Sequence, residues 1–215
     1  MEYITQPVRE IFSLMPDSIL FGSLLLYFLT KNLSYGVFAI FLFETVLSHK
    51  LISWIFSQSV GPSRPAYTKE EDLVTCRAGF KTAQTKIDRI FSHDQYPSYG
   101  LFAVTSIATY LKMATSEFAD TMDAMGTEWQ TRNLLVNIFI GIVIGICIVA
   151  RAYTCDSISD IVVAIVLAII VGLVFFGVNK ALFGQEAMNF LGLPNMVTKE
   201  SQGTPIYVCA VEKSQ

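Results

Sequence analysis

The chain has 215 residues, of which 53% are hydrophobic and only 15% are charged. A soluble domain of this size carries about a quarter charged residues, so the composition favours a membrane protein with one domain. The net charge of -3 and the absence of a Lys/Arg-rich run exclude a typical nucleic-acid-binding protein. The four cysteines have neither the spacing of metal ligands nor that of a disulfide framework. We therefore expect no metal and no cofactor.

The order of apolar and polar segments predicts an all-α membrane protein with a bundle of about five transmembrane helices. Residues 1–16 are expected to form an interfacial N-terminal segment, because apolar side chains recur there at helical spacing. Residues 17–183 are expected to form the bundle. Residues 184–215 read as a polar C-terminal tail with a short extended stretch at 206–211.

Each expected span approaches the ~20 apolar residues that cross a bilayer. The spans are predicted at 18–30 with 11–15 added, 33–56, 97–114, 134–150 and 157–183. Gly141 and Gly145 lie four residues apart in the fourth span. This spacing predicts that another helix approaches closely there.

Glu44 interrupts the second span. An ionisable side chain at that depth is costly, so we expect Glu44 to face the bundle interior or water. One interpretation is a pairing within the bundle, with Lys50 or a hydroxyl group. The other is a direct role in a transport pathway.

The long polar stretch at 57–96 contains Arg64-Pro65 and a segment that favours a short surface helix carrying Arg77 and Lys81. Loops of this length are usually functional or disordered, and we expect a functional one. This loop and the C-terminal tail are the surfaces on which we expect protein partners.

Two further polar clusters flank predicted spans. Pro97 suits the first turn of a helix, and Ser98 with the free N–H groups of that turn would make an anion cradle. Arg151, Asp156 and Asp160 precede and open the fifth span.

Five spans place the N-terminus, the 57–96 loop and the Arg151–Asp160 turn on one side of the membrane. That side would hold nine of the 15 basic residues: Arg9, Lys50, Arg64, Lys69, Arg77, Lys81, Lys86, Arg89 and Arg151. The positive-inside rule makes this side cytoplasmic.

Together, Arg64, Ser98 and Arg151 would form a phosphate pocket, helped by Arg77 or Lys81. Guanidinium groups match phosphate oxygens two at a time, and an anionic phospholipid head group is the natural ligand at a membrane surface. The alternative is that the arginines bond to carbonyl groups or pair with the nearby aspartates.

The order of these clusters resembles the type 2 phosphatidic acid phosphatase (PAP2) superfamily. Its members are helical-bundle enzymes, most of them in membranes, that remove phosphate from lipids through a phosphohistidine, and their motifs are K-x6-RP, PSGH and SR-x5-H-x3-D. Arg64-Pro65 matches the first motif, Pro97-Ser98 the second, and Arg151 with Asp160 the third. The resemblance covers about residues 61–176 and implies a PAP2-like helical core at 57–176.

The chain departs from the motifs at the catalytic positions. Ser57 stands at the lysine position, Gly100 at the histidine of the second motif and Asp156 at the nucleophilic histidine. Because the reaction needs an imidazole nucleophile and a second histidine as acid, we expect a non-enzymatic structural or interaction component of a membrane. The small, altered chain would suit a specialised membrane such as the internal membrane of a large virus.

Two other functions stay open. The chain would be a divergent lipid phosphatase if Asp156 or His93 replaced the lost groups. It would be a small channel or transporter if Glu44 lined a pathway, although five spans without inverted repeats argue against this.

Overall fold

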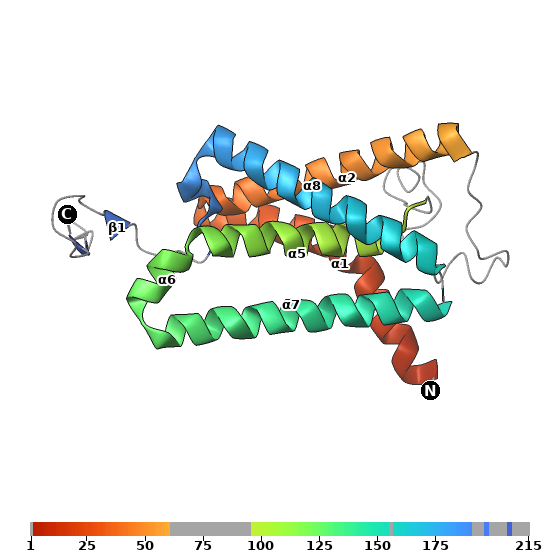
Figure 1. The fold of residues 1–215 in the computed structure, drawn as a ribbon, viewed down its shortest axis with the longest axis horizontal. Helices are drawn as coiled ribbons and strands as arrows, with labels where there is room; N and C mark the ends of the chain where they lie inside the picture. Colours follow the sequence, from red (N-terminus) through yellow and green to blue (C-terminus); the bar gives the residue numbers. More distant parts are fainter. Residues whose placement is uncertain (1, 61–95, 155–156, 191–195, 198–205, 208–215) are drawn as a thin grey trace.

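The computed structural model describes residues 2–60, 96–154, 157–190, 196–197 and 206–207 (Figure 1). The elements are α1 (Glu2–Thr30), α2 (Leu33–Val60), α5 (Tyr99–Glu117), α6 (Ala119–Met125), α7 (Thr127–Thr154), α8 (Ile158–Phe183), the 3-10 helix η1 (Gln185–Met188), and the strands β1 (Met196–Val197) and β2 (Ile206–Tyr207). The two short strands pair antiparallel. Because the described elements are helices apart from these two-residue strands, the expected helical fold class is confirmed.

The helix directions follow from side-chain contacts between helices. Ser106 of α5 donates a hydrogen bond to the carbonyl of Ala168 in α8, 62 residues later. Glu117 bonds to Lys180, 63 residues later, further along the same two helices. This constant offset shows that α5 and α8 run parallel, so both begin at one end of the bundle. We call this the Ser98 end, and the opposite end, with Glu117, Lys180 and η1, the Lys180 end.

Helix α5 is the most enclosed helix of the bundle, with nearly every residue from Tyr99 to Ala108 buried. In α8, Ala164, Ala168 and Gly172 are buried at four-residue intervals and form a narrow stripe of small residues. A Cβ added at Gly172 would lie 2.9 Å from the carbonyl oxygen of Ser106. The absence of a side chain at this position therefore allows α5 and α8 to approach closely.

An aromatic cluster packs the half of the bundle nearer the Lys180 end. The rings of Phe41 and Tyr110 stack with centroids 3.9 Å apart, and Phe176 meets Tyr110 edge to face. Phe38 of α2 and Phe190, which follows η1, close the cluster. Aromatic pairs of this kind contribute about 0.5–1.5 kcal/mol beyond their buried area.

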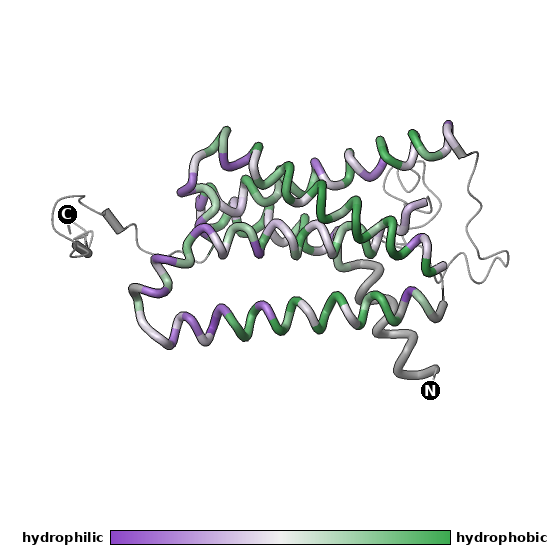
Figure 2. Tube along the Cα trace, viewed as in Figure 1, coloured by the Kyte–Doolittle hydropathy of each residue, from purple (hydrophilic) through white to green (hydrophobic). Residues whose placement is uncertain are grey.

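Among the described residues, three helices are long and apolar enough to cross a membrane: Leu33–Ser59, Thr127–Val149 and Ile158–Phe183. A shorter apolar helical segment covers Asp17–Thr30. Figure 2 shows apolar residues along α7 and α8, and large apolar side chains on their outer surfaces are exposed. Such surfaces suit contact with lipid tails, because the apolar chains of lipid do not penalise exposed aliphatic groups.

Some elements differ from the expectations. Residues 2–30 form one continuous helix, without a break between an interfacial segment and a first span. Ala187 and Met188, in the predicted polar tail, are buried against the bundle. Helix α5 is not among the candidate membrane spans found in the described part of the chain.

Among the described residues, the expectation for the two glycines of α7 was wrong. A Cβ added at Gly141 or Gly145 would meet no described atom within 4 Å, and both residues are exposed. The close helix approach occurs at Gly172 instead. A four-residue glycine spacing permits such an approach, but which helix face turns inward depends on the whole bundle.

A candidate anion site at one end of the bundle

The structure brings the described members of two predicted clusters to the Ser98 end. Cys147 of α7 packs in one cluster with Leu101 of α5 and Ile161 of α8. Arg151 lies four residues beyond Cys147, which is about one helical turn closer to the end of the bundle. Ser98 lies three residues before Leu101, and Asp160 directly precedes Ile161, so all three polar residues lie toward the same end of the bundle.

Helix α2 fixes the chain just before α5. The Nε2 atom of His49 lies 2.6 Å from the carbonyl oxygen of Pro97 and donates to it. Four residues later in the same helix, the hydroxyl of Ser53 donates to the carbonyl oxygen of Tyr96. These bonds hold both carbonyl groups towards α2.

Ser98 precedes the first residue of α5 but does not cap the helix through its side chain. Its side chain is 6% exposed, and its Oγ atom has no hydrogen-bond partner among the described residues. The first N–H groups of a helix lack acceptors within that helix. The start of α5 thus places a buried hydroxyl group, without a partner among the described residues, at a helix N-terminus, which is an arrangement that favours an anion.

Asp160 caps helix α8. The Ser157 hydroxyl accepts from the backbone N–H of Asp160, and the Asp160 carboxylate accepts from the backbone N–H of Ser157. This reciprocal pair is a capping box. The sequence resemblance placed Asp160 in a catalytic motif, and the structure gives its carboxylate a helix-capping contact.

Tyr96 links the start of α5 electrostatically to the start of α8. Burial and the nearby negative charge of Asp160 raise the pKa of the Tyr96 phenol. The phenol therefore stays neutral at physiological pH, and its ring packs against Phe56 of α2.

Arg151 occupies the last turn of α7 and is partly buried. A cation at the carboxyl end of a helix interacts favourably with the helix dipole. Among the described residues, Arg151 therefore adds a positive charge at the end of the bundle where α5 begins.

Several predicted residues lie outside the described residues. These are Arg64, Pro65, Arg77, Lys81, His93 and Asp156. Pro97 is described; it is buried, and its carbonyl makes the contact with His49.

Glu44 lies closer to the other half of the bundle. Its Oε2 atom accepts a hydrogen bond of 3.0 Å from the Asn179 side chain. The partner is thus an amide of α8, where the sequence suggested Lys50 or a hydroxyl. In the part of the chain that the structure describes, no group of three or more His, Cys, Asp and Glu side chains has the arrangement to hold a metal ion.

Sequence reasoning missed the role of α2 in forming the site. His49 and Ser53 meet residues more than 40 positions away, so local patterns do not reveal these contacts. A signal was nevertheless present: Thr45, His49 and Ser53 recur every four residues in an apolar helix, and all three are buried. A polar stripe at this spacing indicates the face of a membrane helix that turns towards the protein.

Comparisons of the chain with protein-family models, with curated proteins and with solved structures found no match. The fold and composition are those of a helical protein with apolar helices that could span a membrane, and the described polar residues Ser98, Arg151 and Asp160 lie toward one end of the bundle.

Proposed function

We propose that this chain is a multi-pass, non-enzymatic membrane protein that binds a phosphate-bearing lipid head group at the Ser98 end. The observation that carries the proposal is the buried Ser98 hydroxyl, which has no partner among the described residues and stands at the start of α5. A buried polar group without a partner costs about 1–3 kcal/mol. A bound anion that accepts from Ser98 and from the adjacent N–H groups would remove this cost.

The charges and the position of the site support a phosphate group as the ligand. Arg151 supplies a guanidinium group near the start of α5, and guanidinium groups bind phosphate oxygens in pairs. The site lies where apolar helices end, which is the level of lipid head groups. On this proposal, Arg64, Arg77 and Lys81 of the preceding loop add further positive charge.

The proposal includes a PAP2-like scaffold, based on the order of the three sequence motifs. The parallel course of α5 and α8 supports it, because the second and third motifs then open two helices at the same end. The proposed scaffold keeps anion binding without the phosphohistidine chemistry. It serves as a structural or interaction component of its membrane.

His49 does not supply the missing nucleophile. Its ring is 1% exposed, lies 5.0 Å from the ring of Tyr99, and donates through Nε2 to Pro97. A histidine that attacks phosphorus needs an accessible ring nitrogen. The described contacts of His49 instead hold the start of α5 in position.

Binding of a short-chain phosphatidic acid to the purified protein in detergent tests the proposal, with short-chain phosphatidylcholine as the control lipid. We expect phosphatidic acid to bind more tightly, and Ser98→Ala and Arg151→Gln each to weaken its binding about tenfold. Gln58→Ala, on an exposed residue near the end of α2, is the matched control. Equal binding of both lipids, unaffected by these variants, would contradict the proposal.

Release of phosphate from phosphatidic acid is measured in the same preparation. We expect none above the blank. Release that disappears in Asp156→Ala or His93→Ala would replace the proposal with an active, divergent phosphatase.

A further inference from the structure

We propose that Glu44 is a proton-binding site within the membrane, where its side chain exists as a neutral carboxylic acid hydrogen-bonded to Asn179. This inference is independent of the anion site, which lies at the other end of α5. It rests on the depth of Glu44, on its surroundings and on the nature of its partner.

Glu44 lies near the middle of the candidate span Leu33–Ser59. Its neighbours on the outer surface of α2 are large apolar residues, and Ile40, Phe43 and Leu47 are all exposed on the side that suits lipid. Glu44 itself is partly exposed at the edge of this surface. A charged carboxylate in such surroundings is strongly disfavoured relative to the neutral acid.

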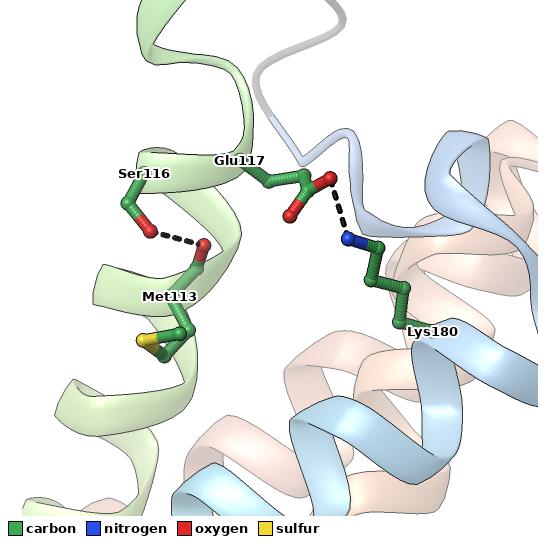
Figure 3. A network of polar contacts seen from close by, with 4 residues as sticks. All are labelled: Met113, Ser116, Glu117 and Lys180. Carbon is green, nitrogen blue, oxygen red and sulfur yellow. Dashed lines mark hydrogen bonds and ion pairs between the residues drawn. The ribbon is translucent and has the colours of Figure 1, made fainter.

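The partner of Glu44 is neutral. Asn179 is fully buried and donates from Nδ2 to Oε2 over 3.0 Å. Among the described residues, no lysine or arginine forms a salt bridge with Glu44, and the nearby cation on α8, Lys180, is paired with Glu117 at 2.6 Å. Figure 3 shows that Lys180 and Glu117 point toward each other from α8 and α5. An amide hydrogen bond alone does not offset the cost of a charge in hydrocarbon.

The elements packed around α2 carry few other titratable groups at this level. Helix α5 contributes Tyr110, which is fully buried and donates its hydroxyl to the sulfur of Met188 at 3.4 Å. Helix α8 contributes Lys180, η1 contributes Glu186, and α1 contributes Tyr27, which packs against Gly36. None of these residues supplies an unpaired positive charge to Glu44. The two acids therefore differ in their partners: Glu117 forms a salt bridge with Lys180, whereas Glu44 is hydrogen-bonded to the neutral amide of Asn179 and, on this proposal, holds a proton.

Dicyclohexylcarbodiimide tests this difference, because it enters membranes and reacts with protonated carboxyl groups. The acid O–H adds across a C=N bond of the reagent to give an O-acylisourea, which rearranges to a stable N-acylurea without a leaving group. With the full chain in lipid nanodiscs at about pH 7.5, well above the ordinary glutamate pKa of about 4.3, we expect an adduct on Glu44 and none on Glu117. Peptide mass spectrometry locates the adduct, and Glu44→Gln should abolish it.

A second measurement does not depend on access of the reagent. Glutamine has the shape of a protonated glutamate, so Glu44→Gln should unfold at about the same temperature as the wild type at about pH 3.5, below the ordinary glutamate pKa of about 4.3. If the folded chain holds a proton that the unfolded chain releases, the wild type should lose stability relative to Glu44→Gln between about pH 4 and about pH 8. A wild type that gains stability relative to Glu44→Gln over this range, or equal labelling of Glu117 and Glu44, would overturn the proposal.

Discussion

At the scale of single residues, the polar side chains at the Ser98 end are of two kinds. Some form hydrogen bonds that hold the helices in place, and the Ser98 hydroxyl forms none with the described residues. His49 donates a hydrogen bond to the carbonyl group of residue 97, and Ser53 donates one to that of residue 96. The Asp160 carboxylate accepts from the backbone N–H before the start of α8. The Ser98 hydroxyl makes no hydrogen bond with the described residues. This contrast makes Ser98 the residue at which stability and ligand binding should respond in opposite directions.

Ser98→Ala should leave the free energy of unfolding unchanged or raise it by about 1 kcal/mol, because it removes a buried hydroxyl that makes no described bond. The same variant should weaken binding of phosphatidic acid. Thermal unfolding with and without this lipid measures both effects. A loss of stability in the lipid-free protein would show that the hydroxyl already has a structural partner.

Asp160→Asn should lower the pKa of Tyr96, because it removes one of the two causes that raise it, the carboxylate charge. Absorbance of the phenolate at alkaline pH measures this, and the difference between the Asp160→Asn protein and the same protein with Tyr96→Phe isolates the one tyrosine. Since the folded state favours the neutral phenol, this group contributes stability below the ordinary tyrosine pKa of about 10 and loses it above that value. An unchanged titration would place Asp160 away from Tyr96.

At the scale of helices, the contact between α5 and α8 dominates the bundle. The stripe of small residues in α8 lets α5 approach so closely that Ser106 reaches the backbone of Ala168. The parallel register of these two helices also sets the position of the candidate site, because it fixes Ser98 and Asp160 at the same end.

Gly172→Ala should destabilise the protein by about 1–3 kcal/mol, because the new methyl group would overlap the Ser106 carbonyl oxygen and the Thr109 side chain. This cost exceeds the gain of about 1 kcal/mol that alanine brings to a helix. Gly141→Ala, at a position with open space, is the matched control and should not destabilise. Thermal unfolding in detergent compares the two, and equal effects would contradict the described packing.

The sequence was sufficient to predict the long apolar helices but not the continuity of α1, the short helices α6 and η1, or the contacts between helices. Long apolar runs located α2, α7 and α8, and the proline and serine before residue 99 located the start of α5. In contrast, the burial of Met188 under Tyr110 and the contact of Glu44 with Asn179 join residues 78 and 135 positions apart. Local periodicity carries no information on such pairs. Motif order led us to expect Ser98, Arg151 and Asp160 at one end of the bundle, but it gave no indication of the supporting role of His49.

At the scale of the whole molecule, the helix directions predict sidedness. Helices α2 and α7 end at the Ser98 end, and α5 and α8 begin there. The ends of α6 and the start of α7 lie at the opposite end (Figure 1). If the bundle spans the membrane several times, residues at these two ends face different compartments.

Single cysteines introduced into a chain with its four native cysteines replaced by serine test this arrangement. A membrane-impermeant maleimide should label Gln58→Cys and Ser157→Cys from one side of sealed vesicles, and Glu128→Cys only from the other side. All three positions are exposed in the structure. Labelling of all three from one side would show that α7 does not cross the membrane and would contradict this sidedness.

The enclosed position of α5 has a consequence for biosynthesis. This helix carries Thr105, Ser106 and Lys112, and it is not among the candidate membrane spans found in the described residues. We therefore do not expect the translocon to release α5 into lipid by itself. Its closest partner, α8, is made about 60 residues later. We therefore expect α5 to enter the bilayer only once α8 has emerged from the ribosome, so that the most central helix of the bundle is among the last to be inserted.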